Sequence, residues 1–433
     1  MVIKRQEISL RGSMAMMYSG YDLANVTGFD CETLLAGVEK SGKDIIVYGA
    51  GIQSRTIIQI LDYIRSKNLK IRLIDSNRRK VGELFQGKII EDVSILEELN
   101  KNDCIVLIGS CFPGQILKAL GGRAPAYSIL PIYEKYKYLL SEIDLNSNDL
   151  QYKRSVNDVE REMLLYDTEF SNLVCSLDNK SLSLKSIDAV VTEGCSLKCK
   201  DCSNLMQYYH RPKNAHLEML IESTRNILSC IDEVFEWRIL GGEPFLFKQL
   251  GSYLDYLSTE KKIRKVVIYT NGTIKPKHKI LEGIKACDAI VDISNYGELS
   301  RNLSGLTDLL KEHDISHAVK DPKWTDSGKI TSKQNLQENQ LENRFFNCCT
   351  RDVLTLLHGY VYRCPFSANL MNLSDGFIDE TDRVYVGNKA AVNTRERLSE
   401  LYKGKRFLSA CDNCNGRDYT TPFVATAIQT RQV

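Results

Sequence analysis

The sequence lacks a surplus of charge, a long apolar run and an apolar leader segment. Its 433 residues contain 57 Lys+Arg against 55 Asp+Glu, so it has no basic excess of the kind that attracts nucleic-acid phosphates. No apolar run approaches the roughly 20 residues that a membrane-spanning helix needs. The first 17 residues carry charges as far as residue 11 and contain no apolar core of a signal peptide. We therefore predict a cytoplasmic protein with neither nucleic acid nor membrane as a partner.

The chain is too long for one hydrophobic core. Its hydrophobic content of 43% and charged content of 26% are ordinary for a soluble globular protein. Because single cores stop growing at about 250–300 residues, this length predicts roughly three domains. The sequence patterns described below place them at residues 1–150, 151–345 and 346–433.

The first 150 residues read as alternating strands and helices. Short apolar runs at 44–50, 70–75 and 104–109 are separated by helical patterns, which favours a parallel α/β sheet of the Rossmann-like type. A charged, helical stretch from 133 to 175 follows and predicts a connector to the next domain.

A glycine-containing turn follows the first of these strands. The stretch GAGIQS places Gly49 and Gly51 between strand and helix, with Asp75 24 residues after Gly51, as in a dinucleotide-binding fingerprint. Ser54 replaces the third glycine, so the motif is incomplete. Two interpretations stay open: binding of a nucleotide or nucleotide-sugar through Gly49, Gly51 and Asp75, or a tight turn that serves only the chain geometry.

A second α/β series begins near residue 180. Strand-like runs at 187–192, 236–240, 265–270, 288–293 and 315–319 alternate with helical stretches. Five or six such units predict a partial (β/α)6 TIM barrel, whose chemistry gathers at the carboxyl ends of the strands. The first four strands lead into a three-cysteine loop, GGEP, TNG and SNYG respectively. The fact that all four motifs follow strands is stronger evidence for a site at this end of the sheet than any one motif alone.

Fourteen cysteines are the most unusual feature of the composition. In a reducing compartment, clustered cysteines are more often metal ligands than disulfides. Six are scattered and are expected to be structural: Cys31, Cys104, Cys111, Cys175, Cys230 and Cys287. The other eight fall at four places and are our candidate metal ligands: Cys195, Cys199, Cys202, Cys348, Cys349, Cys364, Cys411 and Cys414. Five of these eight follow residue 345, which predicts a small, metal-organised C-terminal unit.

Three thiolates on one loop suit an iron–sulfur cubane with one iron left open. Such clusters normally take four cysteines, so Cys195, Cys199 and Cys202 would leave one iron free to bind a substrate or cosubstrate. A structural zinc site completed by His210 is the alternative.

The spacing CxxxCxxC after one strand, followed by Gly241-Gly242-Glu243-Pro244 after the next, resembles the radical S-adenosylmethionine (radical SAM) enzymes. The resemblance implies a 4Fe–4S cluster whose open iron is chelated by SAM, and a 5′-deoxyadenosyl radical that abstracts a substrate hydrogen. It also implies that Gly241 to Pro244 line the methionine amino group, and that Asn271 and Ser294 lie near the SAM ribose and carboxylate. One residue departs from the family pattern: Asp201 occupies a position that is commonly aromatic.

The later cysteines resemble the auxiliary-cluster extension of the twitch/SPASM subgroup. Cys349, Cys364 and the pair Cys411 and Cys414 match it, with Gly359 at a hairpin turn between the first two. No further cysteine follows Cys414, which implies the twitch form with one auxiliary 4Fe–4S cluster. Cys348 competes with Cys349 as the first ligand, and a Cys₄ zinc site is the alternative.

The substrate is inferred by analogy alone. The Rossmann-like unit looks like modules attached to enzymes of polysaccharide and nucleotide-sugar metabolism. We therefore predict an oxidoreductase or epimerase that acts on a C–H of a sugar, polyol or nucleotide-linked substrate, with flavodoxin or ferredoxin as reducing partner. Radical modification of a peptide or protein side chain is the runner-up, and a non-catalytic metal scaffold is the third hypothesis. Candidate substrate contacts near the strand ends are His317, Lys320, Tyr296 and Arg238.

Overall fold

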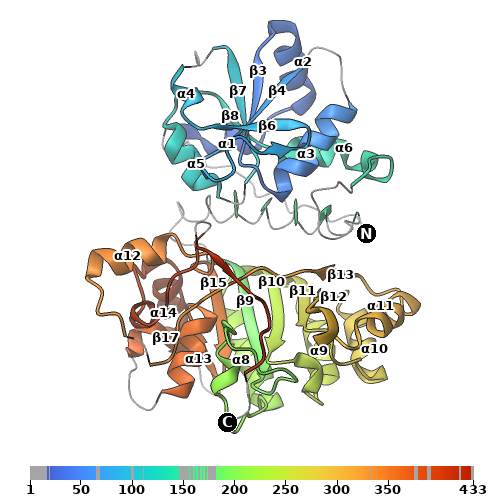
Figure 1. Ribbon diagram of the computed structural model, residues 1–433, viewed down its shortest axis with the longest axis vertical. Coiled ribbons are helices and arrows are strands. Elements are labelled where there is room, and N and C mark those ends of the chain that lie inside the picture. Colours follow the sequence, from blue (N-terminus) through green and yellow to red (C-terminus); the bar gives the residue numbers. More distant parts are fainter. Residues whose placement is uncertain are drawn as a thin grey trace. The chain divides into compact units, whose positions relative to one another are not determined.

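The computed structural model forms two compact units, Met1–Asn179 and Lys180–Val433 (Figure 1). The prediction about a leader segment falls on residues 1–16, which lie outside the described residues, as do Cys111 and Cys175. The structure describes residues 17–18, 20–64, 69–98, 102–110, 112–145, scattered positions from 156 to 173, 182–331, 333–374, 379–387, 392–418 and 421–430.

The first unit contains a six-stranded sheet in the order β5-β6-β4-β3-β7-β8. Its strands are β3 (Asp44–Tyr48), β4 (Lys70–Asp75), β5 (Leu84–Phe85), β6 (Lys88–Asp92), β7 (Cys104–Ile108) and β8 (Ala126–Ser128). Only the β5–β6 pair is antiparallel. The parallel α/β sheet predicted from the three apolar runs is thus confirmed. The strand order reverses beside β3, as it does in doubly wound sheets.

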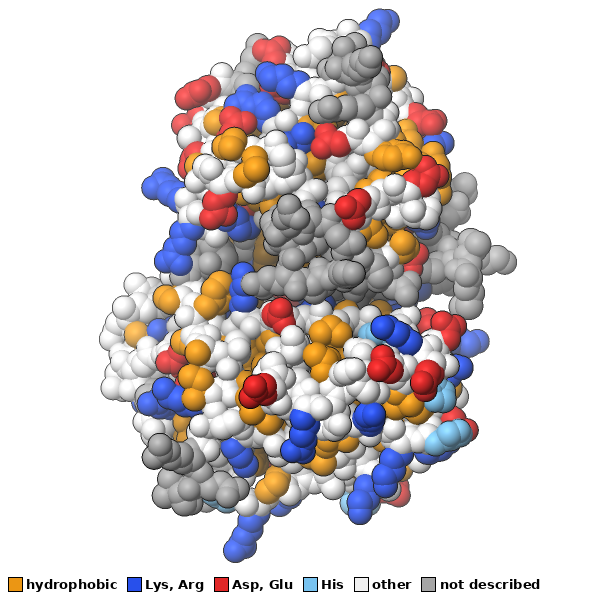
Figure 2. All heavy atoms as spheres, turned by 45° about the vertical axis from the view of Figure 1, so that its right-hand side comes forward, with side chains coloured by type: hydrophobic (Ala, Val, Ile, Leu, Met, Phe, Trp, Pro, Cys, Tyr) orange, Lys and Arg blue, Asp and Glu red, His pale blue; other side chains and the backbone are white. Residues whose placement is uncertain are grey.

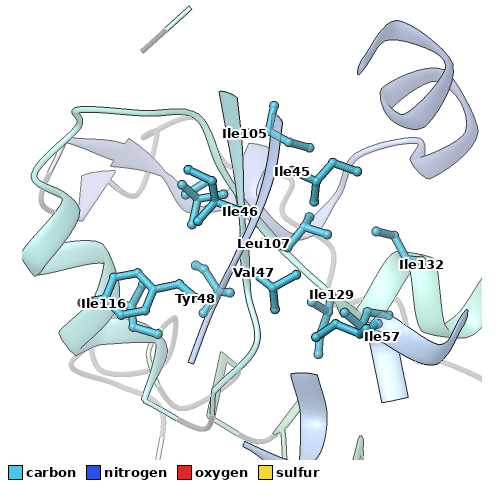
Figure 3. Packing of buried hydrophobic residues seen from close by; sticks show 14 of the residues in the cluster. Ile45, Ile46, Val47, Tyr48, Ile57, Ile105, Leu107, Ile116, Ile129 and Ile132 are labelled. Carbon is cyan, nitrogen blue, oxygen red and sulfur yellow. The ribbon is translucent and has the colours of Figure 1, made fainter. Parts of the chain in front are cut away.

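Helices cover both faces of this sheet, and the core lies between them. In Figure 3, Val47 of β3 lies on the side of Ile57, whereas Ile46 and Tyr48 lie on the side of Ile116. Every residue of β3 is buried, which explains why its sequence is continuously apolar instead of alternating. The helices are α1 (Leu23–Thr27), α2 (Cys31–Ser41), α3 (Ile52–Tyr63), α4 (Ile95–Glu98), α5 (Pro113–Leu120) and α6 (Leu130–Tyr136). A short pair, β1 (Met17–Tyr18) and β2 (Tyr21–Asp22), precedes them.

The second unit contains an eight-stranded sheet in the order β13-β12-β11-β10-β9-β15-β16-β17. The strands are β9 (Ser183–Thr192), β10 (Glu233–Gly241), β11 (Ile263–Thr270), β12 (Ile290–Ser294), β13 (His317–Lys320), β15 (Val353–Leu357), β16 (Tyr360–Tyr362) and β17 (Arg383–Tyr385). The five predicted strands are all present. They run parallel to one another, and β15 joins them as a sixth parallel strand. The closure of these strands into a partial barrel stays a prediction.

The two faces of this sheet differ in chemistry. Ile187, Ala189 and Val191 of β9 belong to the hydrophobic core that the helices complete. Because side chains alternate along a strand, Ser186 and Asp188 point to the opposite, inner face. The helices on the apolar side are α8 (Leu217–Cys230), α9 (Leu250–Leu257), α10 (His278–Ala286) and α11 (Leu303–Glu312).

The C-terminal region extends the same sheet. β15 pairs with β9, and β16 and β17 continue from it as antiparallel neighbours. The predicted third part, residues 346–433, therefore shares one compact unit with the second. This region also contains α12 (Glu338–Phe346), α13 (Pro365–Leu373), α14 (Thr394–Ser399) and an antiparallel pair of short strands, β14 (Trp324–Thr325) and β18 (Phe423–Val424).

Two surface properties bear on the predicted partners. None of the helices in the described part of the chain is long and apolar enough to cross a membrane. On the face drawn in Figure 2, basic and acidic side chains are interspersed on both units.

Candidate functional site

The carboxyl ends of the parallel strands in the second unit bring the predicted motifs together. The three-cysteine loop follows β9, and the segment Gly241–Pro244 begins at the last residue of β10. Asn271 follows β11, and Ser294 is the last residue of β12. Because these strands are parallel neighbours, the four segments lie along one edge of the sheet.

Two glycines allow the segment after β10 to lie directly against the cysteine loop. A Cβ on Gly242 would stand 2.6 Å from the Cβ of Cys195 and would overlap the carbonyl oxygen of Gly194. A Cβ on Gly241 would overlap the carbonyl oxygen of Thr192. The backbones are joined by hydrogen bonds from Gly242 N to Thr192 O, at 2.9 Å, and from Glu243 N to Gly194 O, at 2.8 Å. No larger residue permits this approach.

Glu243 ties the ends of two strands together. Its side chain is fully buried. The carboxylate accepts hydrogen bonds from Thr270 Oγ1 at 2.8 Å, from Asn271 N at 2.9 Å and from Phe245 N at 3.2 Å. Burial raises its pKa to about 7, and these hydrogen bonds work in the opposite direction. Glu243 therefore positions Asn271 relative to the cysteine loop.

Asn271 contacts the cysteine loop itself. Its Nδ2 donates to Ser196 Oγ at 3.1 Å and lies 3.7 Å from Cys195 Sγ. Ser300 Oγ donates to the carbonyl oxygen of Asn271 at 2.7 Å and lies 3.2 Å from that of Ser294. Pro244 is buried at the first position of a short 3₁₀ helix. The segment Gly241–Pro244 and Asn271 thus lie at the cysteine loop, and their contact with SAM stays a prediction.

The three thiols of the loop lie in one small apolar cluster. Cys195, Cys199 and Cys202 pack with Leu197 and Ala427. Burial raises the pKa of Cys195 to about 12 and that of Cys199 to about 11, so the free thiols stay protonated. A bound cation reverses this preference, because a coordinating thiol is deprotonated. Leu197 N and Asn271 Nδ2 lie 3.5 and 3.7 Å from Cys195 Sγ, so N–H donors are available to stabilise a thiolate there.

A segment near the C-terminus covers the loop. Lys200 N donates to Ile428 O and Thr430 N donates to Lys198 O, both at 2.7 Å. Gln429 accepts from Lys198 N at 2.8 Å through Oε1 and donates from Nε2 to Cys199 Sγ at 3.2 Å. In Figure 1 the red end of the chain runs back to the green segment after β9. Sequence reasoning missed Gln429, because 230 residues separate it from Cys199 and it belongs to no motif.

A second group of cysteines lines a cavity in the C-terminal part. The thiols of Cys348, Cys364, Cys411 and Cys414 come from three segments, with Cys411 and Cys414 on the same one. The other lining residues are Arg344, Phe345, Thr350, Arg351, Phe366, Leu408, Ala410, Gly416 and Arg417. Cys364 precedes α13, and its sulfur accepts from Ser367 N at 3.3 Å, while Cys414 Sγ accepts from Gly416 N at the same distance.

Only one cysteine of the Cys348-Cys349 doublet lines this cavity. Cys348 lines it, whereas Cys349 does not and is exposed. A hydrogen bond between the two thiols lowers the pKa of Cys348 and raises that of Cys349. The backbone N–H of Cys349 donates to Arg417 O at 2.8 Å. This arrangement favours Cys348 as the fourth thiol of the group.

Arginine side chains complete the surroundings of both groups. Arg344 Nη1 donates to Cys411 O at 2.9 Å and also contacts Cys414 O. Burial raises the pKa of Cys202 and of Cys414, and the guanidinium of Arg417 works against burial at each of them. One cation thus acts on a thiol of both groups.

The histidine proposed for the zinc alternative lies apart from these contacts. His210 is exposed on the segment after the cysteine loop. Within the described ranges, no three histidine, cysteine or carboxylate side chains converge closely enough to hold a single metal ion.

The four residues predicted to contact substrate have different partners in the structure. Tyr296 packs with the thiol cluster and edge-on against Trp324, with ring centroids 5.6 Å apart. Lys320 Nζ pairs with Asp292 Oδ2 at 2.8 Å. Arg238 Nε donates to Glu236 Oε2 at 2.7 Å. His317 Nδ1 lies 3.0 Å from Ile315 O, a local contact. Of the four, Tyr296 belongs to the cysteine-loop cluster.

The glycine-containing turn of the first unit is tightly fastened. Gly49 has a φ of +103°, and a Cβ there would lie 2.8 Å from Ser110 Cβ. Gly51 is the N-cap of α3. Asp75 accepts from Ala50 N at 2.7 Å and from Asn77 N at 2.8 Å, and it pairs with Lys80 Nζ at 3.3 Å. Asp75 therefore holds the turn itself.

Ser54, the residue that breaks the glycine pattern, also has a packing role. Its Oγ donates to Gly109 O on the segment after β7 at 2.8 Å and contacts Gly49 O. A Cβ on Gly109 would overlap this hydroxyl. Close approach of helix and strand is thus provided here by Gly109 and Ser54 together. These contacts explain why glycine, serine and aspartate occupy the turn without any ligand. Binding of a nucleotide stays a prediction.

No protein-family model and no curated protein matches the chain. Among solved structures it is similar to BtrN in complex with AdoMet and 2-DOIA, with 15% identity over 54% of this chain and 93% of that chain and a TM-score of 0.37. It is also similar to anSMEcpe with bound AdoMet, with 14% identity, 52% and 78% coverage and a TM-score of 0.34. For Streptococcus suis SuiB the values are 12%, 59%, 73% and 0.25. These TM-scores are too low to assign a function, and the function proposed below is therefore based on the residues of the site.

Proposed function

We propose that this protein is a radical SAM iron–sulfur enzyme. One observation carries the proposal: the loop with Cys195, Cys199 and Cys202 lies against a two-glycine segment and Asn271 at one edge of a parallel sheet. The described residues bring three cysteines to this cluster of thiols and four to the other. Cys195, Cys199 and Cys202 would hold a cubane with one iron open to SAM, and such a cluster, once reduced by one electron, would cleave SAM into methionine and a 5′-deoxyadenosyl radical.

The surrounding residues have separable tasks in this proposal. Gly241 and Gly242 let their segment lie directly against the loop, and we assign this segment to the methionine end of SAM and Asn271 and Ser294 to its ribose and carboxylate. Glu243 follows β10 and accepts hydrogen bonds from Thr270 and Asn271 at the end of β11, so it keeps the ends of the two strands together. Gln429 covers the loop on the side of Cys199 and restricts the access of water.

The second group is proposed to hold an auxiliary 4Fe–4S cluster on Cys348, Cys364, Cys411 and Cys414. The support is a cavity lined by four thiols together with aromatic and aliphatic side chains. Four cysteines occupy all four irons, so this cluster is suited to electron transfer and not to binding substrate.

The reaction is proposed to be oxidation or epimerisation at a C–H of a sugar, polyol or nucleotide-linked substrate. The polar inner face of the sheet, which includes Asp188, Arg238 and Lys320, supports a hydroxylated substrate over an apolar one. A flavodoxin or ferredoxin is the proposed reductant.

The proposal is tested with protein reconstituted anaerobically with iron and sulfide. We expect about eight irons per chain, and release of 5′-deoxyadenosine from SAM when dithionite is added. Sugars and nucleotide-sugars deuterated at carbinol positions are then supplied, and transfer of deuterium into 5′-deoxyadenosine identifies the substrate. Tight zinc with no iron would contradict the proposal. Deuterium transfer from a peptide instead would overturn the substrate class alone.

A further inference from the structure

Three buried polar atoms on the inner face of the second sheet have no hydrogen-bond partner among the described residues. They are Ser186 Oγ, Asp188 Oδ1 and Thr355 Oγ1. Ser186 and Thr355 are fully buried, and Asp188 is 6% exposed. A buried polar group without a partner costs about 1–3 kcal/mol, so native structures rarely retain several together.

The three residues are neighbours. Thr355 on β15 lies directly opposite Asp188 on β9 in the parallel register. Ser186 precedes Asp188 by two residues and therefore points to the same face. On the other side of Asp188, its register partner on β10 is Arg238. The three atoms thus form one patch on the adjacent strands β9 and β15, with Arg238 beside it on β10.

Arg238 does not satisfy this patch. Its Nη1 lies 3.9 Å from Asp188 Oδ1, which is longer than a hydrogen bond, while its Nε donates to Glu236 Oε2. Burial raises the pKa of Asp188 to about 6, and the charge of Arg238 opposes the rise. Asp292 on the same sheet differs from Asp188, because it pairs with Lys320 at 2.8 Å. A carboxylate of this sheet can thus be hydrogen-bonded internally, whereas Asp188 Oδ1 has only the 3.9 Å ion pair with Arg238 and no hydrogen bond among the described residues.

We propose that Ser186, Asp188 and Thr355 form a hydroxyl-binding patch that takes neighbouring hydroxyl groups of a polyol or sugar ring. A carboxylate accepts from a hydroxyl, the Ser and Thr hydroxyls both donate and accept, and the guanidinium of Arg238 donates to a ring or hydroxyl oxygen. A diol therefore supplies the donors and acceptors that the patch lacks. This inference rests on the proposed function for its substrate class but assigns the residues that recognise it.

The chain offers a matched control. Ser223 Oγ is fully buried and has no partner in the described residues, but it lies on α8, on the helix-covered side of the sheet. Ser223→Ala removes the same kind of hydroxyl without touching the patch. Thr355→Val and Ser186→Ala remove hydroxyls from the patch with little change in volume, and Asp188→Asn removes its charge.

The first measurement is calorimetric binding of myo-inositol, glucose and UDP-glucose to reconstituted protein. We expect at least one probe to bind, and each patch variant to bind it about tenfold or more weakly than wild type, with Ser223→Ala unchanged. Absence of binding by every probe, or equal weakening by Ser223→Ala, overturns the proposal.

The second measurement is the melting temperature without any probe. Thr355→Val removes an unsatisfied hydroxyl, so we expect a rise of about 2 °C together with weaker binding. A fall in melting temperature shows that the hydroxyl is satisfied within the fold, and it contradicts the proposal. Formation of 5′-deoxyadenosine by wild type is scored separately. Its absence overturns the radical SAM function, whereas loss of probe binding with that activity intact overturns the patch.

Discussion

The two groups of cysteines differ in how the chain assembles them. The first group lies within eight residues, 195–202, and its loop is held by the ends of neighbouring strands. The second draws Cys348, Cys364, Cys411 and Cys414 from segments spread over 67 residues and joined through Arg344 and Arg417. The compact group has three thiols and the dispersed group has four. The group for which we propose a centre with one open position is thus the one held by the ends of the parallel strands.

The comparison also shows two ways of directing donors at sulfur. The dispersed group uses backbone N–H groups within two or three residues of Cys364 and Cys414. The compact group adds side chains from distant segments, Asn271 and Gln429. Donors of the second kind are lost by single substitutions, so the two centres should respond differently to mutation.

The largest expected difference comes from removing one thiol of each group. Cys199→Ala should lose about four of about eight irons and all formation of 5′-deoxyadenosine from SAM. Cys411→Ala should lose a similar amount of iron yet still cleave SAM, because the three-thiol loop is intact. Iron content and 5′-deoxyadenosine are measured on both variants under anaerobic conditions. If both variants lost SAM cleavage equally, the assignment of SAM cleavage to the three-cysteine loop alone would be wrong.

The next effect should come from the backbone approach beside the loop. Gly242→Ala places a Cβ 2.6 Å from that of Cys195, so we expect destabilisation of about 1–3 kcal/mol and loss of iron from the loop alone. Thermal unfolding and iron content report these effects. The control is Gly37→Ala in α2, where a Cβ meets no atom within 4 Å and helix propensity predicts a gain of about 0.5–1 kcal/mol. Full iron occupancy in Gly242→Ala would contradict the expected contact.

A smaller effect should separate the members of the doublet. Cys348→Ser should lower occupancy of the second cluster, because Cys348 lines the cavity. Cys349→Ser should leave the iron content at the wild-type value. Mössbauer spectra and iron analysis distinguish the variants, and the reverse pattern would assign Cys349 as the ligand.

The smallest expected effect is electrostatic. Gln429→Glu keeps the acceptor for Lys198 N but removes the donor to Cys199 Sγ. Loss of this hydrogen bond and the negative charge that Glu adds beside the sulfur should together make the reduction potential of the proposed first cluster more negative by roughly 60 mV, the equivalent of about 1.4 kcal/mol, and leave the second unchanged. Redox titration followed by electron paramagnetic resonance measures both. An equal shift of both reduction potentials would show that residue 429 acts through long-range electrostatics and not through its hydrogen bond to Cys199.

The strands and the local motifs were predictable because their signals are short in range. The run at 187–192 predicted β9, and the cysteine spacing lies within one loop. Contacts that close long loops were not predictable. Gln429 against Cys199 and the choice of Cys348 over Cys349 depend on chain packing that no motif encodes.

Two further features were hidden for different reasons. The separate C-terminal domain expected after residue 345 is joined to the sheet by the pairing of β15 with β9, and parallel pairing leaves no turn signal in the sequence. Asp188 sits within the apolar run IDAVVT, where burial suggests a structural role. Only the register shows that it lies opposite Thr355 and lacks a hydrogen bond.

The segment 427–430 has a consequence for how the protein is made. It is synthesised about 230 residues after the loop that it covers. At about 5–20 residues per second, the ribosome takes tens of seconds to produce it once the cysteines have emerged. During that interval the segment that covers the thiols of the loop does not yet exist. If the loop takes up the proposed cluster, the order of translation leaves the three thiols uncovered for loading, and Gln429 becomes part of the cover afterwards.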